Sequence, residues 1–169
     1  MPSSNLAVWP LILHFVHEVP HDAILDVGPG WGKAATLLRE YISPTPTRID
    51  AVEAHVPYIA EHRLAALYDD VIGGDVCDLG PSSFDPYDVV ILGDVIEHIE
   101  KDEALSLLDR IRCRIVIATP VDFFQTDEGL PETERHVSHW TRSDFADARV
   151  ERIDENHIGG LIVRLGPLA

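Results

Sequence analysis

The sequence predicts an α/β fold, in which a doubly wound, mostly parallel sheet carries helices on both faces within a single domain covering residues 1–169. Apolar segments that fit strands alternate with amphipathic segments that fit helices along most of the chain, which is the pattern of such a sheet. Two of the apolar segments, 87–93 and 113–120, are nearly continuous, as expected for strands that are buried on both faces. The length of 169 residues allows one sizeable core and leaves no room for a second substrate domain.

The first element is an N-terminal docking helix within residues 1–20. Trp9, Ile12, Leu13 and Val16 fall on one face of this helix, so we expect that face to pack against the rest of the domain. The segment has neither a basic leader nor a small-residue cleavage site, and it is too short and too polar to cross a bilayer. We therefore expect neither a signal peptide nor a membrane anchor here.

The alternating strands and helices follow this first helix. Strands are expected in the short apolar runs 23–28, 48–53, 70–75, 87–93 and 113–120. Helices are expected where apolar residues recur at helical spacing, in 33–42, 56–68 and 100–111. A final hairpin is expected from residues 149–154 and 160–166.

A short helix is expected at residues 140–148, before that hairpin. Thr141 and Asp144 have the spacing of a reciprocal capping pair at the start of a helix. Trp140 and Phe145 occupy the positions of a hydrophobic staple, in which two apolar side chains pack across the helix start. These signals agree with one another and define where this helix begins.

The charge balance is strongly acidic, with 13 basic and 29 acidic residues and a formal net charge of −16. A field of this sign repels nucleic-acid backbones and anionic lipid surfaces, so we expect neither DNA nor a membrane as a partner. The two cysteines, Cys77 and Cys113, lack the spacing of a disulfide framework or a structural zinc site. Reduced thiols are usual in the cytoplasm, which is the location we predict.

Candidate binding residues lie where the predicted strands end, because ligands of parallel sheets bind beyond the carboxyl ends of the strands. The first strand ends at Asp26 and a loop with alternating glycines, which lets the backbone approach a ligand closely. That loop lacks the third glycine of a dinucleotide fingerprint, since Lys33 stands at its position. Glu53, at the end of the second strand, suits a ribose diol, and Asp75, after the third, could meet an adenine edge.

Four stretches, ILDVGPGWGK, IDAVEA, GGDV and YDVVILGDVIEH, give the chain a resemblance to the class I S-adenosylmethionine-dependent methyltransferases over almost its whole length. The resemblance implies a Rossmann-like seven-stranded sheet whose last strand is antiparallel, and S-adenosylmethionine as the cofactor. It implies a donor site formed by Asp26, Gly28, Pro29, Gly30, Glu53, Asp75, Val76 and Gly93. In such a site the first loop holds the methionine end, Glu53 the ribose, and Asp75 with Val76 the adenine.

The segment DVIEH follows the fourth strand and carries two carboxylates and an imidazole. If a helical turn begins directly after the strand, Asp94, Glu97 and His98 share one face and form half of a divalent-metal site. In the alternative interpretation no metal is bound. Asp94 then flanks the cofactor, and Glu97 lies in the first turn of a helix, where the helix dipole favours an acid.

A further ligand would come from residues 121–139, a long polar segment that we expect to form a lid over the acceptor. It contains His136 and His139, just before a Trp-Thr pair. This arrangement resembles the small-RNA 3′-terminal 2′-O-methyltransferases, which carry ExxEH after the fourth strand and a metal-binding histidine shortly before a Trp-Thr helix start. In that alignment Asp94 replaces the first glutamate and His136 matches the later histidine. Ubiquinone-pathway O-methyltransferases carry a related ExxEH element.

The narrower resemblance implies a divalent metal (manganese, magnesium, cobalt or iron) with the ligands Asp94, Glu97, His98 and His136. Asp94, His98 and His136 are then the predicted catalytic residues, and the metal would lower the pKa of the acceptor hydroxyl. Scattered basic residues and the lack of an appended RNA-binding domain favour the hydroxyl of a small molecule as the methyl acceptor. The resemblance itself favours the 2′-hydroxyl of RNA, so both acceptor classes stay open.

Two further classes of protein compete with a methyltransferase. A nicotinamide-dependent oxidoreductase is disfavoured by the missing third glycine, and by the lack of a second domain and of an evident Tyr-x-x-x-Lys pair. A non-catalytic cofactor-binding subunit that activates a partner chain stays open. The intact DVIEH segment argues against that role, because an inactive subunit has no need for this set of side chains.

Overall fold

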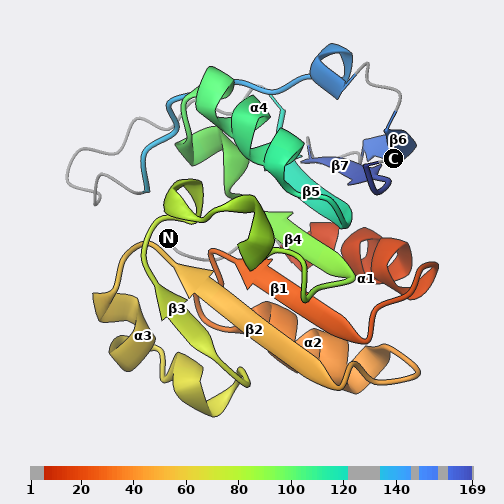
Figure 1. Ribbon diagram of the computed structural model, residues 1–169. Coiled ribbons are helices and arrows are strands. Elements are labelled where there is room, and N and C mark those ends of the chain that lie inside the picture. The colour runs from red at the N-terminus through yellow and green to blue at the C-terminus, as the bar shows by residue number, and fades with distance from the viewer. Residues whose placement is uncertain (1–5, 122–133, 146–148, 156–159, 169) are drawn as a thin grey trace.

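The computed structural model describes residues 6–121, 134–145, 149–155 and 160–168, and its centre is one seven-stranded sheet (Figure 1). The strands are β1 (Ala23–Val27), β2 (Arg48–Glu53), β3 (Val71–Gly73), β4 (Val89–Gly93), β5 (Arg114–Pro120), β6 (Val150–Glu155) and β7 (Gly160–Leu165). They lie in the order β3-β2-β1-β4-β5-β7-β6. β7 runs antiparallel to both of its neighbours, whereas the other neighbouring pairs are parallel. The predicted α/β fold with an antiparallel last strand is confirmed.

Helices cover both faces of this sheet. The α-helices are α1 (Trp9–His17), α2 (Lys33–Tyr41), α3 (Pro57–Glu61) and α4 (Lys101–Arg110). Single turns of 3-10 helix are η1 (Leu6–Val8), η2 (Leu64–Ala66), η3 (Val76–Asp78), η4 (Pro81–Ser83), η5 (Ile96–His98) and η7 (Arg142–Phe145). α1 and α2 pack on one face and α4 on the other (Figure 1). In the part of the chain that is described, no helix combines the length and the apolar character that crossing a bilayer requires.

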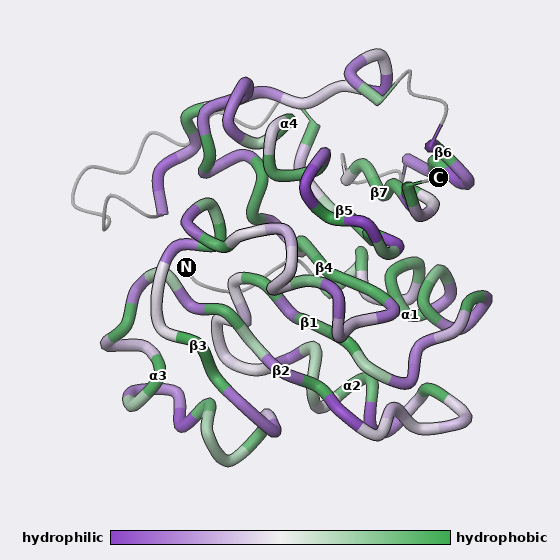
Figure 2. The backbone as a smooth tube through the Cα atoms, in the orientation of Figure 1, coloured by the Kyte–Doolittle hydropathy of each residue, from purple (hydrophilic) through white to green (hydrophobic). Residues whose placement is uncertain are grey.

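Alternating side chains of the central strands divide the core into two halves, one on each face. On β1, Ile24 packs in the half covered by α1 and α2, whereas Leu25 packs in the half covered by α4. On β4, Ile91 and Leu92 are divided in the same way, and both are fully buried. Figure 2 shows the result as hydrophobic strands at the centre of the fold, with hydrophilic turns around them. Burial on both faces explains why the β4 sequence VVILG contains no polar side chain.

The register of the central strands brings three strand ends to one level. Val27, the last residue of β1, lies opposite Val52 of β2 and Leu92 of β4. Because these strands are parallel, the loops that follow them leave from the same edge of the sheet. This carboxyl edge is where the candidate site residues lie.

The structure differs from the sequence-based expectation in the predicted helix 56–68. This segment forms α3 and η2 as two separate pieces. Arg63, between them, has a φ of 54°, a left-handed conformation that interrupts a right-handed helix. Apolar spacing alone therefore overestimated the length of this helix.

The predicted docking face of the first helix is largely confirmed. Trp9, Ile12 and Val16 are buried as expected, and Phe15 joins them, whereas Leu13 is only half-buried. The helix packs against the sheet in the half of the core that also contains α2.

The predicted helix 140–148 begins as the 3-10 helix η7. The Asp144 carboxylate accepts hydrogen bonds from the N–H and the hydroxyl of Thr141, at 2.8 and 2.9 Å. The reciprocal arm differs from the expectation, because the N–H of Asp144 donates to the carbonyl oxygen of Thr141 at 3.0 Å rather than to its hydroxyl. The rings of Trp140 and Phe145 stack with centroids 5.4 Å apart, as the staple predicts. The rest of this helix, and residues 122–133 of the predicted lid, lie outside the described residues.

Candidate active site

The glycine loop after β1, residues 28–32, makes close backbone contacts at the carboxyl edge. Gly28 and Gly30 have φ values of 67° and 53°, in the left-handed region that other residues rarely adopt. The N–H of Gly28 donates to the carbonyl oxygen of Val52 at 2.9 Å. A Cβ atom placed on Gly28 would lie only 2.8 Å from a methyl group of Val95. Glycine is therefore required at position 28 both by its conformation and by the close approach of the turn after β4.

Asp26 lies at the end of β1 and is almost completely buried, with 3% of its surface exposed. The hydroxyl of Tyr68 donates a hydrogen bond to its carboxylate at 2.5 Å. Burial raises the pKa of Asp26 to about 7; the hydrogen bond from Tyr68 opposes this effect, and the negative charge of Glu53 adds to it. A positively charged ligand at this edge would favour the ionised form of this carboxyl group.

Glu53 ends β2 and is also buried. Its carboxylate accepts a hydrogen bond from the N–H of His55 at 2.7 Å. Burial raises the pKa of Glu53, and the charge of Glu134 adds to this effect, whereas hydrogen bonds from backbone N–H groups oppose it. One of these N–H groups belongs to Gly30. Glu53 thus accepts a hydrogen bond from the glycine loop, and its pKa also responds to the charge of Glu134, which follows β5.

The ends of β3 and β4 complete this group of strand ends. The Asp75 carboxylate accepts a hydrogen bond from the N–H of Cys77 at 2.8 Å and so caps the start of η3. Asp75 is exposed, whereas Val76 is buried. Gly93 is the last residue of β4 and lies opposite Ala118 of β5. The residues predicted to bind the donor therefore all lie at the carboxyl ends of β1 to β4.

The predicted helical turn beginning at Asp94 is wrong. Asp94 has a φ of 54°, which a right-handed turn does not contain. Its N–H donates to the carbonyl oxygen of Ala118 at 2.8 Å, so the pairing of β4 with β5 continues for one more residue. The chain turns only after this bond, into η5. The spacing argument that aligned Asp94 with Glu97 and His98 on one helix face consequently fails.

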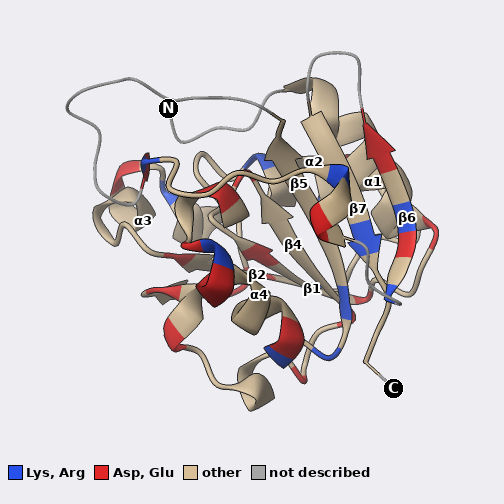
Figure 3. Ribbon diagram, turned by 90° about the horizontal axis from the view of Figure 1, so that it is seen from above, with Lys and Arg blue, Asp and Glu red and all other residues tan. Residues whose placement is uncertain are grey.

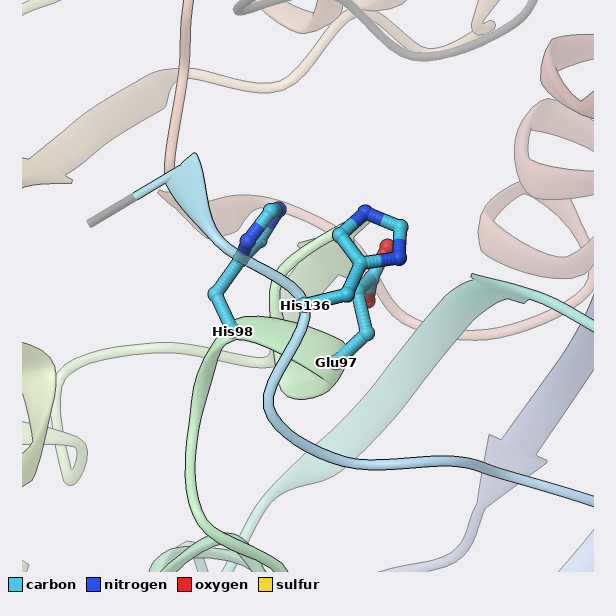
Figure 4. Close-up of side chains that lie close together, drawn as sticks. All are labelled: Glu97, His98 and His136. Atoms are coloured by element: carbon cyan, nitrogen blue, oxygen red, sulfur yellow. The ribbon is translucent and has the colours of Figure 1, made fainter. Parts of the chain in front are cut away.

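Three of the four predicted metal ligands nevertheless come together. Glu97, His98 and His136 each offer one ligand atom, and these atoms all lie within 4.8 Å of one another. Figure 4 shows Glu97 and His98 on the turn after β4 and His136 on the segment that crosses this turn. The two imidazole rings have centroids 4.8 Å apart and are nearly perpendicular, at 82°. Among the residues that the structure describes, Asp94 and His139 are not part of this group.

Glu97 is the most buried member of the group, with 2% of its surface exposed. Thr119 of β5 donates a hydrogen bond to its Oε2 at 3.1 Å, whereas its Oε1 is buried without a hydrogen-bond partner among the described residues. Burial raises the pKa of Glu97 well above its ordinary value, and the charge of Asp94 adds to this effect. A buried carboxylate oxygen without a partner is costly, and a bound cation would satisfy it.

Residues 134–140 are fixed to the η5 turn by hydrogen bonds that use the main chain of the turn. The N–H groups of Val137 and Ser138 donate to the carbonyl oxygen of Glu97 at 2.8 and 3.1 Å. The Ser138 hydroxyl and the Trp140 ring N–H donate to the preceding carbonyl oxygen of the turn, at 2.9 and 3.1 Å. These bonds hold His136 against the turn.

The ring of His98 is oriented by the same segment. Its Nδ1 lies 3.1 Å from the carbonyl oxygen of Arg135. Because a carbonyl oxygen only accepts, Nδ1 carries the proton and the other ring nitrogen keeps its lone pair. Burial lowers the pKa of His98, although the hydrogen bond to Arg135 opposes this effect. The net lowering of the pKa favours the neutral imidazole, which is the form that binds metals.

Sequence reasoning missed several side chains that support the site. Tyr68 and Thr119 each hold a site carboxylate through a hydrogen bond, and their partners are 42 and 22 residues away in the chain. No local pattern signals a partner at such a distance. Trp31 is 61% exposed and stacks on His62 with ring centroids 4.9 Å apart. Its position inside a tight glycine loop was the available signal, because such a loop has little room to bury a large ring.

Comparisons with known proteins agree with this geometry. A family described as a methyltransferase domain matches residues 25–113. The matched residues run from β1 through α4, so they contain the glycine loop, Glu53 and the DVIEH segment but not His136. No curated protein matches the chain.

Solved structures share the fold at low sequence identity. PH0226 protein from Pyrococcus horikoshii OT3 has a TM-score of 0.67 and 17% identity, over 95% of this chain and 88% of that chain. The small RNA methyltransferase HEN1 has a TM-score of 0.68 and 17% identity, over 95% of this chain and 25% of that chain. The mitomycin 7-O-methyltransferase MmcR has a TM-score of 0.65 and 20% identity, over 96% of this chain and 55% of that chain. The chain thus spans only part of the last two proteins, and the likeness concerns the fold.

Proposed function

The chain belongs to the methyltransferase-domain family, and from this premise we propose that it transfers the methyl group of S-adenosylmethionine to a hydroxyl oxygen of a small molecule with the help of a divalent metal. The observation that carries the proposal is the group formed by Glu97, His98 and His136 at the edge of the sheet that also carries the glycine loop. The loop suits the donor, and the group suits an ion beside the acceptor.

The donor is proposed to bind along the carboxyl ends of β1 to β4. The proposed contacts are Asp26, Gly28, Pro29, Gly30, Glu53, Asp75, Val76 and Gly93. The carboxylate of Glu53 can accept two hydrogen bonds from a ribose diol. The left-handed conformation of Gly28 brings the main chain close to the space where a donor would lie. The acidic groups at this edge favour S-adenosylmethionine, because its sulfonium is positively charged.

The clustered residues fit a divalent ion in their chemistry and in their protonation. One carboxylate and two imidazoles form a ligand set that suits manganese, iron or cobalt. Magnesium fits less well, since it prefers oxygen ligands. The Oε1 atom of Glu97 has no hydrogen-bond partner among the described residues, and the ring nitrogen of His98 that does not face Arg135 keeps its lone pair. Asp94 lies outside the group, so we do not propose it as a ligand.

Methyl transfer requires the acceptor oxygen to lie in line with the bond between sulfur and the methyl group. The new O–CH3 bond forms as the S–CH3 bond breaks, the acceptor loses its proton, and the products are a methyl ether and S-adenosylhomocysteine. A bound divalent ion supplies Lewis acidity, which lowers the pKa of a nearby hydroxyl group. The protein contributes position, because the segment 134–140 and the η5 turn hold His98 and His136 on the acceptor side. These two histidines are the proposed catalytic residues.

The charge distribution supports a small-molecule acceptor. The net charge is −16, and Figure 3 shows basic residues interspersed with acidic ones on α4 and β6. Nucleic acids require basic surfaces that follow the phosphate backbone. The 2′-hydroxyl of RNA is the second candidate, which the position of His136 and the fold likeness to a small RNA methyltransferase favour. We expect no DNA or membrane partner, and a cytoplasmic location stays a prediction.

Calorimetry tests the donor and the metal separately. The native chain should bind S-adenosylhomocysteine, and Glu53→Ala should weaken this binding by about tenfold or more, because it removes the hydrogen bonds to the ribose. The native chain should also bind manganese, and Glu97→Ala and His136→Ala should each abolish that binding. The matched control is His139→Ala, which removes a histidine of the same segment that lies outside the group. Failure to bind S-adenosylhomocysteine would contradict the proposed donor site. Manganese binding that survives His136→Ala would contradict the proposed role of His136 as a metal ligand.

A transfer assay identifies the acceptor class. Tritiated methyl groups should be transferred to members of a panel of small phenols, and a chelator should suppress this transfer. Label that enters total RNA and none of the phenols would support the second candidate instead. Cofactor binding without transfer, until a partner chain is added, would indicate a non-catalytic activating subunit.

A further inference from the structure

Four rings form a continuous aromatic strip at the carboxyl edge of the sheet. Trp31 of the glycine loop stacks on His62, with ring centroids 4.9 Å apart and ring planes at 17°. The ring of His62 lies 4.7 Å from that of Tyr58, which in turn lies 4.4 Å from that of His55. We call these four residues the ring strip. It joins the glycine loop to α3, which follows β2 beside the ends of the strands (Figure 1).

The strip presents an indole ring to the outside of the protein. Trp31 is 61% exposed, whereas Trp9 and Trp140 are buried. Its neighbour in the stack, His62, has an Nε2 atom that is buried without a hydrogen-bond partner among the described residues. A buried nitrogen without a partner costs stability. A role in binding therefore explains the stack better than a gain in stability does.

The strip lies beside the segment that carries His136. The N–H of His55 donates to the carboxylate of Glu53 at 2.7 Å. Burial raises the pKa of Glu53 and of Tyr58, and the charge of Glu134 adds to both effects, so Glu134 lies near both side chains. His136 follows Glu134 by two residues, which span at most about 7 Å. A small molecule with its hydroxyl at the metal group can therefore reach the strip with its other end.

Acidic side chains border the strip. Glu61 is exposed and is the last residue of α3, three residues after Tyr58, so the two share a helix face. Burial raises the pKa of Tyr58, and the charges of Glu134, Glu61 and Glu53 add to this effect. The face of an aromatic ring attracts a cation, most strongly in tryptophan, and nearby carboxylates add to that attraction. The strip thus suits a cationic group and disfavours the phosphates of RNA.

We propose that the ring strip binds a cationic group of the methyl acceptor, so that the acceptor is a small phenol or alcohol that also carries an ammonium group or another organic cation. The inference rests on the proposed function, since it takes a hydroxyl at the metal group as the site of methylation. The hydroxyl end lies beside His98 and His136, and the charged end lies against Trp31 and near the acids that border the strip. The net charge of −16 favours the capture of such a molecule.

Three phenols of similar size separate charge from apolar contact. Tyramine carries an ammonium group, 4-propylphenol is uncharged, and 3-(4-hydroxyphenyl)propanoate carries a carboxylate. Calorimetry uses S-adenosylhomocysteine and manganese as additions, because S-adenosylhomocysteine lacks the sulfonium charge. Tyramine should bind about fivefold or more tighter than 4-propylphenol, and the propanoate should bind most weakly. In an NMR titration tyramine should shift the indole N–H signal of Trp31, which Trp31→Phe assigns by removing it.

Substitutions test the ring and the acid separately. Trp31→Ala should reduce the ratio of the tyramine affinity to the 4-propylphenol affinity to about one, and Trp31→Phe should retain part of the native ratio. Glu61→Gln should lower the ratio about twofold, since an exposed acid contributes little. The matched controls, Tyr41→Ala and Glu40→Gln, remove an exposed ring and an exposed acid at the end of α2 and should keep the native ratio. Thermal unfolding establishes that each variant is folded.

The outcomes separate this inference from the proposed function. Equal affinities for the three phenols, no binding of tyramine, or binding that leaves the Trp31 signal unchanged would overturn the inference while the donor and metal sites stand. A loss of S-adenosylhomocysteine affinity in Trp31→Ala as large as the loss of tyramine affinity would assign the strip to the donor site instead. If the native chain binds neither S-adenosylhomocysteine nor any phenol, the proposed function fails as well.

Discussion

The two halves of the candidate site are built in different ways. The half proposed for the donor is formed by the end of β4 and by short loops that directly follow β1, β2 and β3, and its shape depends on backbone conformations such as that of Gly28. The half proposed for the metal joins the turn after β4 to the segment 134–140, which follows a later strand. Side-chain and main-chain hydrogen bonds to carbonyl oxygens of the η5 turn hold this second half together.

This difference has a consequence for how each half responds to substitution. A loop whose path depends on glycine loses its conformation when a side chain is added at the glycine, because the backbone itself must move. A site held by several separate hydrogen bonds loses affinity in smaller steps, since each bond contributes about 1 kcal/mol. Among the described residues, the two halves approach each other where Val95 lies against Gly28, so coupling between them is expected there.

The largest effect is expected in the donor half. Gly28→Val should abolish binding of S-adenosylhomocysteine, with a loss of at least about a hundredfold, because valine is strained at a φ of 67° and its Cβ would press on Val95. Calorimetry with S-adenosylhomocysteine and with manganese measures both halves. Gly80→Ala is the control, since Gly80 has a φ of −73° and open space around it. A loss of manganese affinity as large as the loss of cofactor affinity would show that the halves are coupled through Val95.

The next effect concerns stability and pH in the donor half. The pKa of Asp26 is about 7 in the folded protein against 3.8 for an unperturbed carboxyl group, so the folded chain binds the extra proton between these values. Its contribution to stability therefore falls as the pH rises from about 4 to about 7, by up to about 4 kcal/mol in total, and is level above that range. Asp26→Asn should flatten this part of the dependence in urea unfolding at several pH values. Burial also raises the pKa of Glu53 and Glu97, so some slope of the same sign should remain. An unchanged slope in the variant would contradict the buried, protonated state of Asp26.

A smaller effect is expected in the metal half. Thr119→Val keeps the size of the side chain but removes the hydrogen bond to Oε2 of Glu97. Residues that orient a ligand carboxylate typically contribute about tenfold or more to metal affinity, so manganese binding should weaken by about that factor. The affinity for S-adenosylhomocysteine should not change, and calorimetry measures both. A parallel loss of cofactor affinity would contradict the separation of the two halves.

The smallest effect is expected at the anchor of the crossing segment. Trp140→Phe preserves an aromatic ring for stacking on Phe145 but removes the N–H that donates to the carbonyl oxygen of Ile96. Stability in urea unfolding should fall by about 1 kcal/mol, and manganese affinity by only a few-fold, because the other anchoring bonds remain. Val137→Ala is the control, since Val137 is 46% exposed and its side chain makes none of the anchoring hydrogen bonds. A complete loss of manganese binding in Trp140→Phe would show that a single bond positions the whole segment.

Much of the fold could be predicted because short stretches of consecutive residues indicate its helices, strands and loops. The apolar run of β4 and the glycine loop after β1 each occupy only a few consecutive residues. The helix predicted at 56–68 was too long because the left-handed conformation of Arg63 has no counterpart in apolar spacing. The same reason applies to Asp94, whose conformation depends on its bond to Ala118 of another strand.

The residues of the two halves of the candidate site were predicted from different kinds of signal in the sequence, and some supporting residues were not predicted at all. The donor residues follow from the rule that ligands bind at the ends of parallel strands, and the structure brings those ends together. His136 was predicted through the resemblance to a known motif, whereas spacing alone did not distinguish it from His139. Tyr68 and Thr119 were not predictable, because a hydrogen bond between distant residues leaves no periodic trace in the sequence.

Glu97 serves the site through two parts of one residue. Its carbonyl oxygen accepts hydrogen bonds from the N–H groups of Val137 and Ser138, and these bonds do not involve its side chain. Its carboxylate alone faces the two histidines. A single codon change at this position would therefore remove the proposed ion while the polypeptide keeps its path around it. Dependence on metal is, in such an architecture, a trait that evolution can add or delete without rebuilding the enzyme.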